Sequence, residues 1–277
     1  MRTIIRASLT AWNARRRRYA HGMDPSTYLR NLFGLHERVA LVTGGSSGIG
    51  KAIALALGGA GAHVLVAART ATAIDATVEE IRGAEGSGDG IVADLSTREG
   101  AHALADAAGG VDILVNSAGI NLRPPMSELD EHTWDTTMRV NLEAPFILGQ
   151  RLAPRMAQRG FGRIIHISSQ QAHRAFASSG AYGVSKAAIE ALARSQSEAW
   201  ASYGVTANVL VPGFVETPLN KRLSSDPEAV QALARRTLIG RNGMPEDFAG
   251  AAVFLASPAS AYVIGQAVTV DGGFSAH

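Results

Sequence analysis

The chain alternates between short runs of apolar residues and longer segments in which apolar residues recur at helical spacing. The first apolar run, Val39 to Val42, ends in glycines, and a helical stretch from Ile49 to Leu57 follows it. Further apolar runs lie at 64–66, 90–92, 111–115, 164–167, 205–211 and 267–270, with helical stretches around 74–81 and 101–108 between them. Continuous apolar runs are typical of strands buried on both faces of a parallel sheet. We therefore predict an α/β fold, a single doubly wound parallel sheet of about seven strands with helices on both faces.

The first 22 residues differ from the rest of the chain in charge. They contain six Arg and no Asp or Glu, which leaves 20 basic residues against 24 acidic ones in the remainder. We predict that 1–22 is a basic extension without fixed structure, 23–36 a lead-in segment, and 37–277 one domain. Three interpretations of the extension stay open: a flexible arm touching anionic surfaces, a transit-like peptide, or sequence upstream of a true start at Met23.

The amino-acid composition excludes several classes of protein and of functional site. Of the 277 residues, 46% are apolar and 18% charged, which fits one folded domain and excludes a disordered chain. The absence of cysteine excludes disulfides, a thiolate nucleophile and zinc–thiolate sites. The near-neutral to acidic body disfavours nucleic-acid binding. No apolar run reaches the roughly 18–20 residues that a membrane span requires. We expect a cytoplasmic protein without a membrane span or a resident metal.

A glycine-rich turn lies between the first predicted strand and the first predicted helix. Thr43–Gly50 reads Thr-Gly-Gly-Ser-Ser-Gly-Ile-Gly, with glycines spaced Gly-x3-Gly-x-Gly. Glycine permits positive φ and close approach of the backbone to a ligand, and the N-terminus of the following helix attracts anions. The turn therefore fits the pyrophosphate of a dinucleotide in a Rossmann-type fold. The alternative is that the glycines serve only the turn.

The same turn resembles the cofactor loop of the short-chain dehydrogenase/reductase family, and other motifs of that family follow in order. Residues 116–119 read Asn-Ser-Ala-Gly, with Ser where the family has a second Asn. Residues 182–186 match Tyr-x-x-x-Lys, 212–217 match Pro-Gly-x-x-x-Thr, and 271–273 match the Asp-Gly-Gly ending. The resemblance covers roughly residues 33–275. It implies an oxidoreductase that transfers a hydride between a nicotinamide cofactor and a carbonyl or secondary alcohol.

Four residues occupy the positions of the family's catalytic tetrad: Asn141, Ser169, Tyr182 and Lys186. A free phenol titrates near pH 10, so we expect the cationic Lys186 and the oxidised nicotinamide ring to lower the pKa of Tyr182. The resemblance implies that Ser169 donates a hydrogen bond to the substrate oxygen and that Asn141 positions a proton-relay water. Ser168 is the alternative to Ser169, although only Ser169 has the family spacing.

The resemblance also implies a set of cofactor contacts. These are Gly44, Ser46, Ser47, Gly48, Ile49, Gly50, Arg69, Asp94, Leu95, Asn116, Ala118, Gly119, Tyr182, Lys186, Pro212, Gly213, Val215 and Thr217. Ala68 takes the position where NAD-using relatives carry an acid, and Arg69 can clamp a ribose 2′-phosphate. We therefore favour NADP(H) over NAD(H). Two alternatives stay open: Arg69 merely begins a solvated helix, and Asp94 caps a helix rather than contacting adenine.

The resemblance also implies substrate contacts in three segments that vary within the family: the stretch after Ile120, the loop after Ser169, and a substrate loop at 214–239. The candidate side chains are Arg123, Gln170, His173 and Phe214. This polar, basic set suits an acidic or polyhydroxylated substrate, and the bland alternative is solvated loop residues. The sequence resembles the gluconate 5-dehydrogenase and β-ketoacyl-carrier reductase branches of the family. The resemblance thus implies a keto-sugar acid such as 5-ketogluconate as substrate. The alternatives are a 3-oxoacyl-carrier-protein reductase and a non-catalytic NADP(H)-binding regulator.

The resemblance further implies a homotetramer. The helices around 131–158 and 180–202 would pair across one two-fold axis, and the carboxy-terminal strand with the helix near 246–256 across another. His166 lies within an apolar run, so we interpret it as a core residue.

Overall fold

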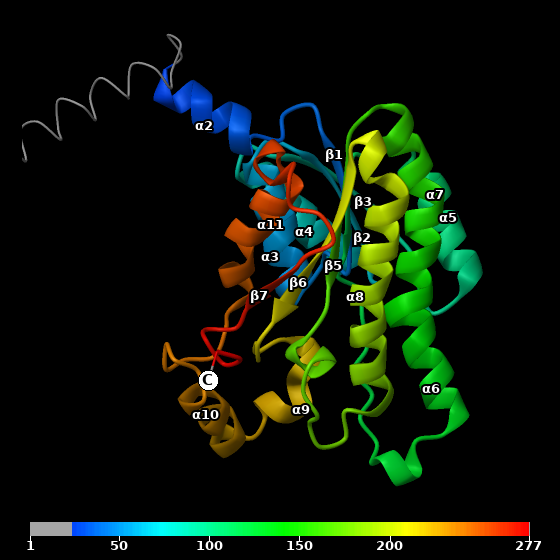
Figure 1. The fold of residues 1–277 in the computed structure, drawn as a ribbon, viewed down its shortest axis with the longest axis vertical. Coiled ribbons are helices and arrows are strands. Elements are labelled where there is room, and N and C mark those ends of the chain that lie inside the picture. Colours follow the sequence, from blue (N-terminus) through cyan, green and yellow to red (C-terminus); the bar gives the residue numbers. More distant parts are fainter. Residues whose placement is uncertain (1–23, 277) are drawn as a thin grey trace, which may run out of the picture.

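Seven strands form one parallel sheet in the computed structural model, which describes residues 24–276 (Figure 1). Their order is β3-β2-β1-β4-β5-β6-β7, and every neighbouring pair is parallel. The strands are β1 (Val39–Thr43), β2 (His63–Ala68), β3 (Ser87–Val92), β4 (Ile113–Asn116), β5 (Gly162–Ile167), β6 (Val205–Pro212) and β7 (Ala267–Val270). The strand order reverses between β1 and β4. The predicted doubly wound sheet of about seven strands is confirmed.

Helices cover both faces of the sheet (Figure 1). One face carries α3 (Gly48–Gly59), α4 (Ala71–Gly83) and α11 (Ala249–Ala256); the other carries α5 (Arg98–Ala108), α7 (Ala144–Gln158) and α8 (Gly180–Trp200). The remaining helices are α2 (Pro25–Phe33), α6 (Glu131–Met138), α9 (Lys221–Ser224) and α10 (Pro227–Arg235). Short 3₁₀ turns lie at 126–128, 170–172, 201–203, 218–220, 245–248 and 258–260.

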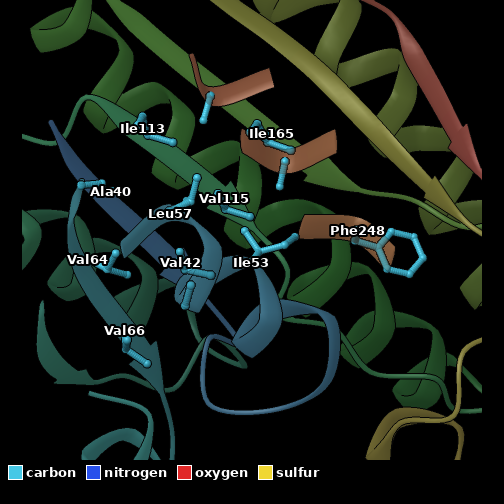
Figure 2. Packing of buried hydrophobic residues seen from close by; sticks show 14 of the residues in the cluster. Ala40, Val42, Ile53, Leu57, Val64, Val66, Ile113, Val115, Ile165 and Phe248 are labelled. Atoms are coloured by element: carbon cyan, nitrogen blue, oxygen red, sulfur yellow. The ribbon is translucent and has the colours of Figure 1, made fainter. Parts of the chain in front are cut away.

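Strand side chains alternate between two cores because successive residues of a strand point to opposite faces. On β1, Ala40 and Val42 belong to the core under α3 and α11, whereas Leu41 belongs to the core under α5 and α7. Figure 2 shows the first of these cores, where Ile53 of α3 and Phe248 lie against the sheet. This two-sided burial explains why the strands read as continuous apolar runs.

The predicted substrate loop at 214–239 is largely helical. It contains a 3₁₀ turn at Pro218–Asn220 followed by α9 and α10, and none of these three elements has a buried residue. Asp226 caps α10 by accepting hydrogen bonds from the N–H groups of Glu228 and Ala229 at 3.1 Å. The segment follows β6 and lies beyond the end of that strand (Figure 1).

Between residues 24 and 276, no helix combines the length and the apolar character needed to cross a membrane. The predicted basic extension, 1–22, lies outside the described residues.

Candidate active site

A pocket opens at the carboxyl ends of β1, β4, β5 and β6, where the strand order reverses. This is where ligands bind in open parallel sheets. Motifs that lie far apart in the sequence meet there. Its walls are Gly44, Ser47–Gly50, Ser117–Gly119, Arg123, Ile167–Gln171, Phe176, Tyr182, Lys186, Pro212–Val215, Thr217–Asn220, Leu223 and Leu233.

The glycine turn has a backbone that only glycine adopts easily. Gly44 and Gly48 have φ of 65° and 51°. A Cβ on Gly44 would lie 2.8 Å from the Ala118 nitrogen, and one on Gly50 would lie 2.3 Å from the Gly44 carbonyl oxygen. Ser47 precedes α3 without a side-chain capping bond, so it leaves the first-turn N–H groups to a ligand. The turn therefore fits a pyrophosphate.

Thr43, which the sequence analysis did not single out, ties this turn to the 116–119 segment. Its Oγ1 donates to the Val115 carbonyl at 3.3 Å and accepts from the N–H groups of Ser117 and Ala118, both at 3.2 Å. A polar residue ending a buried apolar strand was the signal that could have identified it.

Tyr182 and Lys186 both lie buried on α8, one helical turn apart. Lys186 Nζ donates to the Ile167 carbonyl at 2.7 Å and lies 5.6 Å from the centroid of the Tyr182 ring. Burial lowers the pKa of Lys186 to about 8. An ammonium group whose pKa lies this close to neutral pH can both release and accept a proton, which suits a proton relay.

The expected lowering of the Tyr182 pKa does not occur in the protein alone. Burial raises the pKa of Tyr182 to about 12, and the Ser169 hydrogen bond and the Arg123 charge offset only part of that rise. Desolvation disfavours the phenolate more than these neighbours favour it. Tyr182 is therefore a protonated phenol at neutral pH.

The two neighbouring serines have different environments. Both border the pocket, but only Ser169 is hydrogen-bonded to Tyr182. The Ser168 hydroxyl lies 2.9 Å from the Lys186 carbonyl oxygen and 2.7 Å from Glu190 Oε1, both possible acceptors on the α8 side. This placement favours Ser169 as the hydroxyl that meets the substrate.

Asn141 lies in a π-helical turn, Arg139–Glu143, between α6 and α7. Its Oδ1 accepts from the Ile120 N–H and its Nδ2 donates to the Ile120 carbonyl, both at 2.9 Å. Nδ2 also donates to Ser185 Oγ at 3.1 Å. A Cβ on Gly119 would lie 3.3 Å from Asn141 Oδ1 and 3.7 Å from Lys186 Nζ, so this side chain fixes the strand end beside Lys186. Such turns are frequent at functional sites.

Asn116 belongs to a buried polar chain behind the pocket rather than to its wall. Its Nδ2 lies 3.2 Å from His166 Nδ1, and His166 Nε2 lies 2.8 Å from Gln196 Oε1. Because an amide oxygen only accepts, we assign the ring proton to Nε2 and the acceptor role to Nδ1. Burial lowers the pKa of His166 to about 4. His166 is thus a neutral core residue.

The residues predicted to contact the adenosine half of the cofactor do not line the pocket. Arg69 is exposed directly after β2, and Leu95 is buried in the core under α5 and α7. Asp94 accepts from the Ser96 N–H at 2.9 Å; this bond, the Ser96 hydroxyl and the Arg69 charge lower its pKa. Arg69 and Asp94 therefore interact electrostatically at an open edge.

Of the predicted substrate residues, Arg123, Gln170 and Phe214 line the pocket and His173 does not. His173 Nε2 lies 3.0 Å from the buried Glu190 carboxylate. The sequence places His173 near the site, but its orientation towards Glu190 cannot be predicted from the sequence. It missed other wall residues: Phe176, Leu219, Asn220, Leu223 and Leu233.

The fold and the site define a class: a Rossmann-type oxidoreductase with a dinucleotide-binding turn and a Tyr–Lys pair. Residues 44–275 match the family model described as enoyl-(acyl carrier protein) reductase, and the chain belongs to the short-chain dehydrogenase/reductase family. Gluconate 5-dehydrogenase of Gluconobacter oxydans is 36% identical over 249 residues, 88% of this chain and 97% of the relative.

Solved structures of relatives are also similar. A gluconate 5-dehydrogenase from Burkholderia cenocepacia J2315, in complex with NADP and tartrate, matches with a TM-score of 0.85 and 37% identity, covering 90% of this chain and 99% of that one. A 3-oxoacyl (acyl-carrier-protein) reductase from Agrobacterium tumefaciens C58, with NADP bound, matches with a TM-score of 0.85 and 36% identity, covering 90% and 98%. The chain is an oxidoreductase of this family.

Proposed function

We propose that the protein is an NADP(H)-dependent dehydrogenase that interconverts a keto-sugar acid, such as 5-ketogluconate, and the corresponding hydroxy acid. The observation that carries the proposal is the buried Tyr182 hydroxyl, hydrogen-bonded to Ser169 and facing the charge of Arg123 in one pocket. A relative of the gluconate 5-dehydrogenase type supports the sugar-acid class.

The residues present fit the cofactor. The glycine turn, Ser46 included, would hold the pyrophosphate through backbone N–H groups, and residues 212–217 with Ala118 and Gly119 would enclose the nicotinamide half. Lys186 would hold the nicotinamide ribose. When bound, the cofactor supplies or accepts the hydride.

The remaining chemistry is proton transfer by this chain's own residues. In reduction, Tyr182 donates its hydroxyl proton to the substrate oxygen while Ser169 donates a hydrogen bond to the same oxygen. Lys186, whose pKa lies at about 8, returns a proton towards Tyr182. Asn141, held at the end of β4, positions the water that links Lys186 to solvent.

The proposed preference for NADP(H) rests on the end of β2. Ala68 offers no carboxylate that would repel a 2′-phosphate, and the exposed Arg69 follows it. A guanidinium group forms paired hydrogen bonds with phosphate oxygens. The NADP-bound relatives support this assignment.

Oxidation of NADPH and of NADH against a carbonyl panel tests the proposal. The panel contains 5-ketogluconate, a neutral ketohexose and an acetoacetyl thioester of a carrier analogue. We expect the highest kcat/KM with 5-ketogluconate and NADPH. Preference for the thioester makes the protein a 3-oxoacyl-carrier reductase, and tight NADPH binding without turnover of any carbonyl makes it a regulator.

We also propose that the protein forms a cytoplasmic homotetramer. Large apolar side chains are exposed on the helices expected to pair, Phe146 on α7 and Val184 on α8, and Tyr262 is fully exposed beyond α11. Light scattering at micromolar concentration tests the assembly. A stable species of 28.9 kDa contradicts it.

A further inference from the structure

A second cavity adjoins the active-site pocket and extends under α9 and α10. Arg123, Phe176 and Asn220 border both cavities, whereas Arg222 borders only the second. Its floor is apolar, with Leu223 and Leu233 contributing to the wall. The two cavities therefore adjoin each other, with Tyr182 on the wall of the first and Arg222 on the wall of the second.

Two guanidinium groups on the wall of the second cavity, Arg123 and Arg222, form no ion pair with a carboxylate among the described residues. Arg123 is half-buried and donates from Nε to the Ser178 carbonyl at 3.2 Å and from Nη2 to the Ala177 carbonyl, neither of them an anion. The positive charge of Arg222 lowers the pKa of Arg123, after burial as the larger cause, which places the two cations close to each other. Among residues 24–276, Arg222 has no hydrogen bond or ion pair.

The one carboxylate on the wall of this cavity, among the described residues, is Asp226. It accepts from two N–H groups at the start of α10. Arg236, also on the wall, stacks over the Phe274 ring at 4.2 Å. Arg123 and Arg222 are the guanidinium groups of this wall that have neither a carboxylate nor an aromatic partner among the described residues, so their donors are the ones best able to bind an anion.

Two amide side chains, Asn121 and Asn220, also line the second cavity. Asn121 Nδ2 donates to Asn220 Oδ1 at 3.2 Å, and Asn220 Nδ2 donates to the Val215 carbonyl at 3.0 Å. Asn121 Oδ1 is buried and has no hydrogen-bond partner among the described residues. A buried amide oxygen without a partner costs free energy. A substrate hydroxyl entering the cavity would satisfy it.

The order of these groups matches a polyhydroxylated acid. The charge of Arg123 acts on the Tyr182 hydroxyl, and Arg222 borders the adjoining cavity, whose wall does not include Tyr182. In 5-ketogluconate, four carbon–carbon bonds separate the reacting carbon from the carboxylate, with hydroxyl groups between them. With the carbonyl at Tyr182, the carboxylate end of such a substrate can extend towards the second cavity, whose wall includes Arg222.

We propose that Arg222, assisted by Arg123, binds the substrate carboxylate in this second cavity and makes the enzyme select sugar acids over neutral ketoses of the same length. This inference rests on the proposed function and assigns its specificity to a residue of α9. Arg222 is a specificity residue and takes no part in proton transfer.

The kinetic test compares Arg222→Gln with Lys221→Gln, a matched loss of one positive charge at an exposed neighbour that is not on the cavity wall. For Arg222→Gln we expect kcat/KM for 5-ketogluconate to fall about tenfold to a hundredfold, mainly through KM, as for loss of one charge-assisted hydrogen bond. Reduction of a neutral ketohexose should change less than about twofold. Lys221→Gln should leave both substrates nearly unaffected, and Arg222→Lys should restore part of the acid activity.

A binding measurement separates this inference from the proposed function. Tartrate, a polyhydroxylated acid, is titrated calorimetrically into the NADP⁺-loaded enzyme. We expect Arg222→Gln to weaken its binding at least tenfold and Lys221→Gln to leave it unchanged. If no sugar acid is reduced but Arg222→Gln abolishes tartrate binding, the proposed function fails and the carboxylate subsite stands. Equal losses in the two variants, or equal losses for acid and neutral substrates, overturn the subsite.

Discussion

Tyr182 holds its proton firmly in the folded protein, because burial raises its pKa to about 12. A protonated phenol is the form that carbonyl reduction requires, since the alkoxide that forms must receive a proton. The reverse reaction requires a phenolate, and the positive charge of an oxidised nicotinamide ring favours it. The direction of catalysis and the charge of the bound cofactor are therefore coupled at this residue.

Replacing Tyr182 with Phe removes the proton donor while keeping the ring. We expect turnover to fall by at least about 10²-fold, the lower end of the usual contribution of a general acid or base. The melting temperature and the dissociation constant for NADPH should change little. Stopped-flow turnover and fluorescence titration measure these quantities. Near-wild-type turnover would falsify the role given to Tyr182.

His166 makes stability depend on pH in a predictable direction. Its folded-state pKa, about 4, lies below the ordinary value of 6.5, so the unfolded chain binds more protons between these pH values. Stability is therefore fully present above pH 6.5 and is lost as the pH falls towards 4. At pH 5 the expected loss is about 2 kcal/mol.

His166→Gln removes this titration and keeps an amide that can bridge Asn116 and Gln196. Urea unfolding of both proteins at pH 7.5 and pH 5 measures the difference. We expect the variant to lose about 2 kcal/mol less than the wild type between the two pH values. Parallel losses would mean that His166 is charged, or titrates normally, in the folded state.

At the scale of single residues, the sequence identified the candidate catalytic residues but not the burial and contacts of each side chain. The spacing of Ser169, Tyr182 and Lys186 was sufficient to bring them together, because a strand end and one helix face fix their positions. The sequence did not reveal that burial opposes the expected lowering of the Tyr182 pKa in the protein without cofactor, since burial is a property of the whole fold. His173 lies outside the pocket wall, with its Nε2 3.0 Å from Glu190 of α8, an orientation that sequence spacing does not specify.

At the scale of elements, the ends of strands and helices carry the site. The exposed Arg69 lies where β2 ends and α4 begins, a position that fits a ribose phosphate. Helical period and apolar runs predicted where β1 and α3 lie, and the family resemblance implied the helix that is α8. They did not predict the π turn at Asn141, because its hydrogen bonding departs from the 3.6-residue period of the helices that flank it.

Part of the helical structure of the 214–239 segment can be predicted from its sequence. Asp226 followed by Pro227 and Glu228 is a helix start, with an N-cap side chain, a proline in the first turn and an early acid. This pattern predicts a helix at the position of α10, where only a loop was expected. The cavity that contains Arg222 would still have been hidden, because it depends on how α9 and α10 pack over the pocket.

Replacing Arg69 with Ala tests the cofactor preference. We expect the KM for NADPH to rise about tenfold to a hundredfold, as for a lost charge-assisted phosphate contact, and the KM for NADH to stay within about twofold. Arg82→Ala is the control, because Arg82 is an exposed arginine of α4 that pairs with Asp89. If both cofactors are affected equally, Arg69 does not contact the 2′-phosphate.

At the scale of the whole molecule, the parallel sheet explains how distant motifs form one site. Each crossover returns the chain to the same edge, so residues 44–50, 116–119 and 212–217 all follow carboxyl ends of neighbouring strands. The alternating pattern was therefore enough to predict the fold class. Residues 1–22 contribute no predicted strand to it and lie outside the described residues.

The described part of the chain contains every group that the proposed chemistry uses, and its first fully buried core side chain is Leu35. Helix α2, which precedes it, has no buried residue. We therefore expect a chain that begins at Met23 to fold, bind NADPH and turn over within about twofold of the full chain, a difference of about 0.4 kcal/mol in the barrier. Side-by-side steady-state kinetics and thermal unfolding test this.

Terminal segments can be tied down by packing, and Leu9 and Trp12 are the apolar residues able to do so. A melting temperature several degrees lower for the shortened chain, or a clear loss of activity, would mean that the extension belongs to the catalytic domain and that the proposed boundary is wrong.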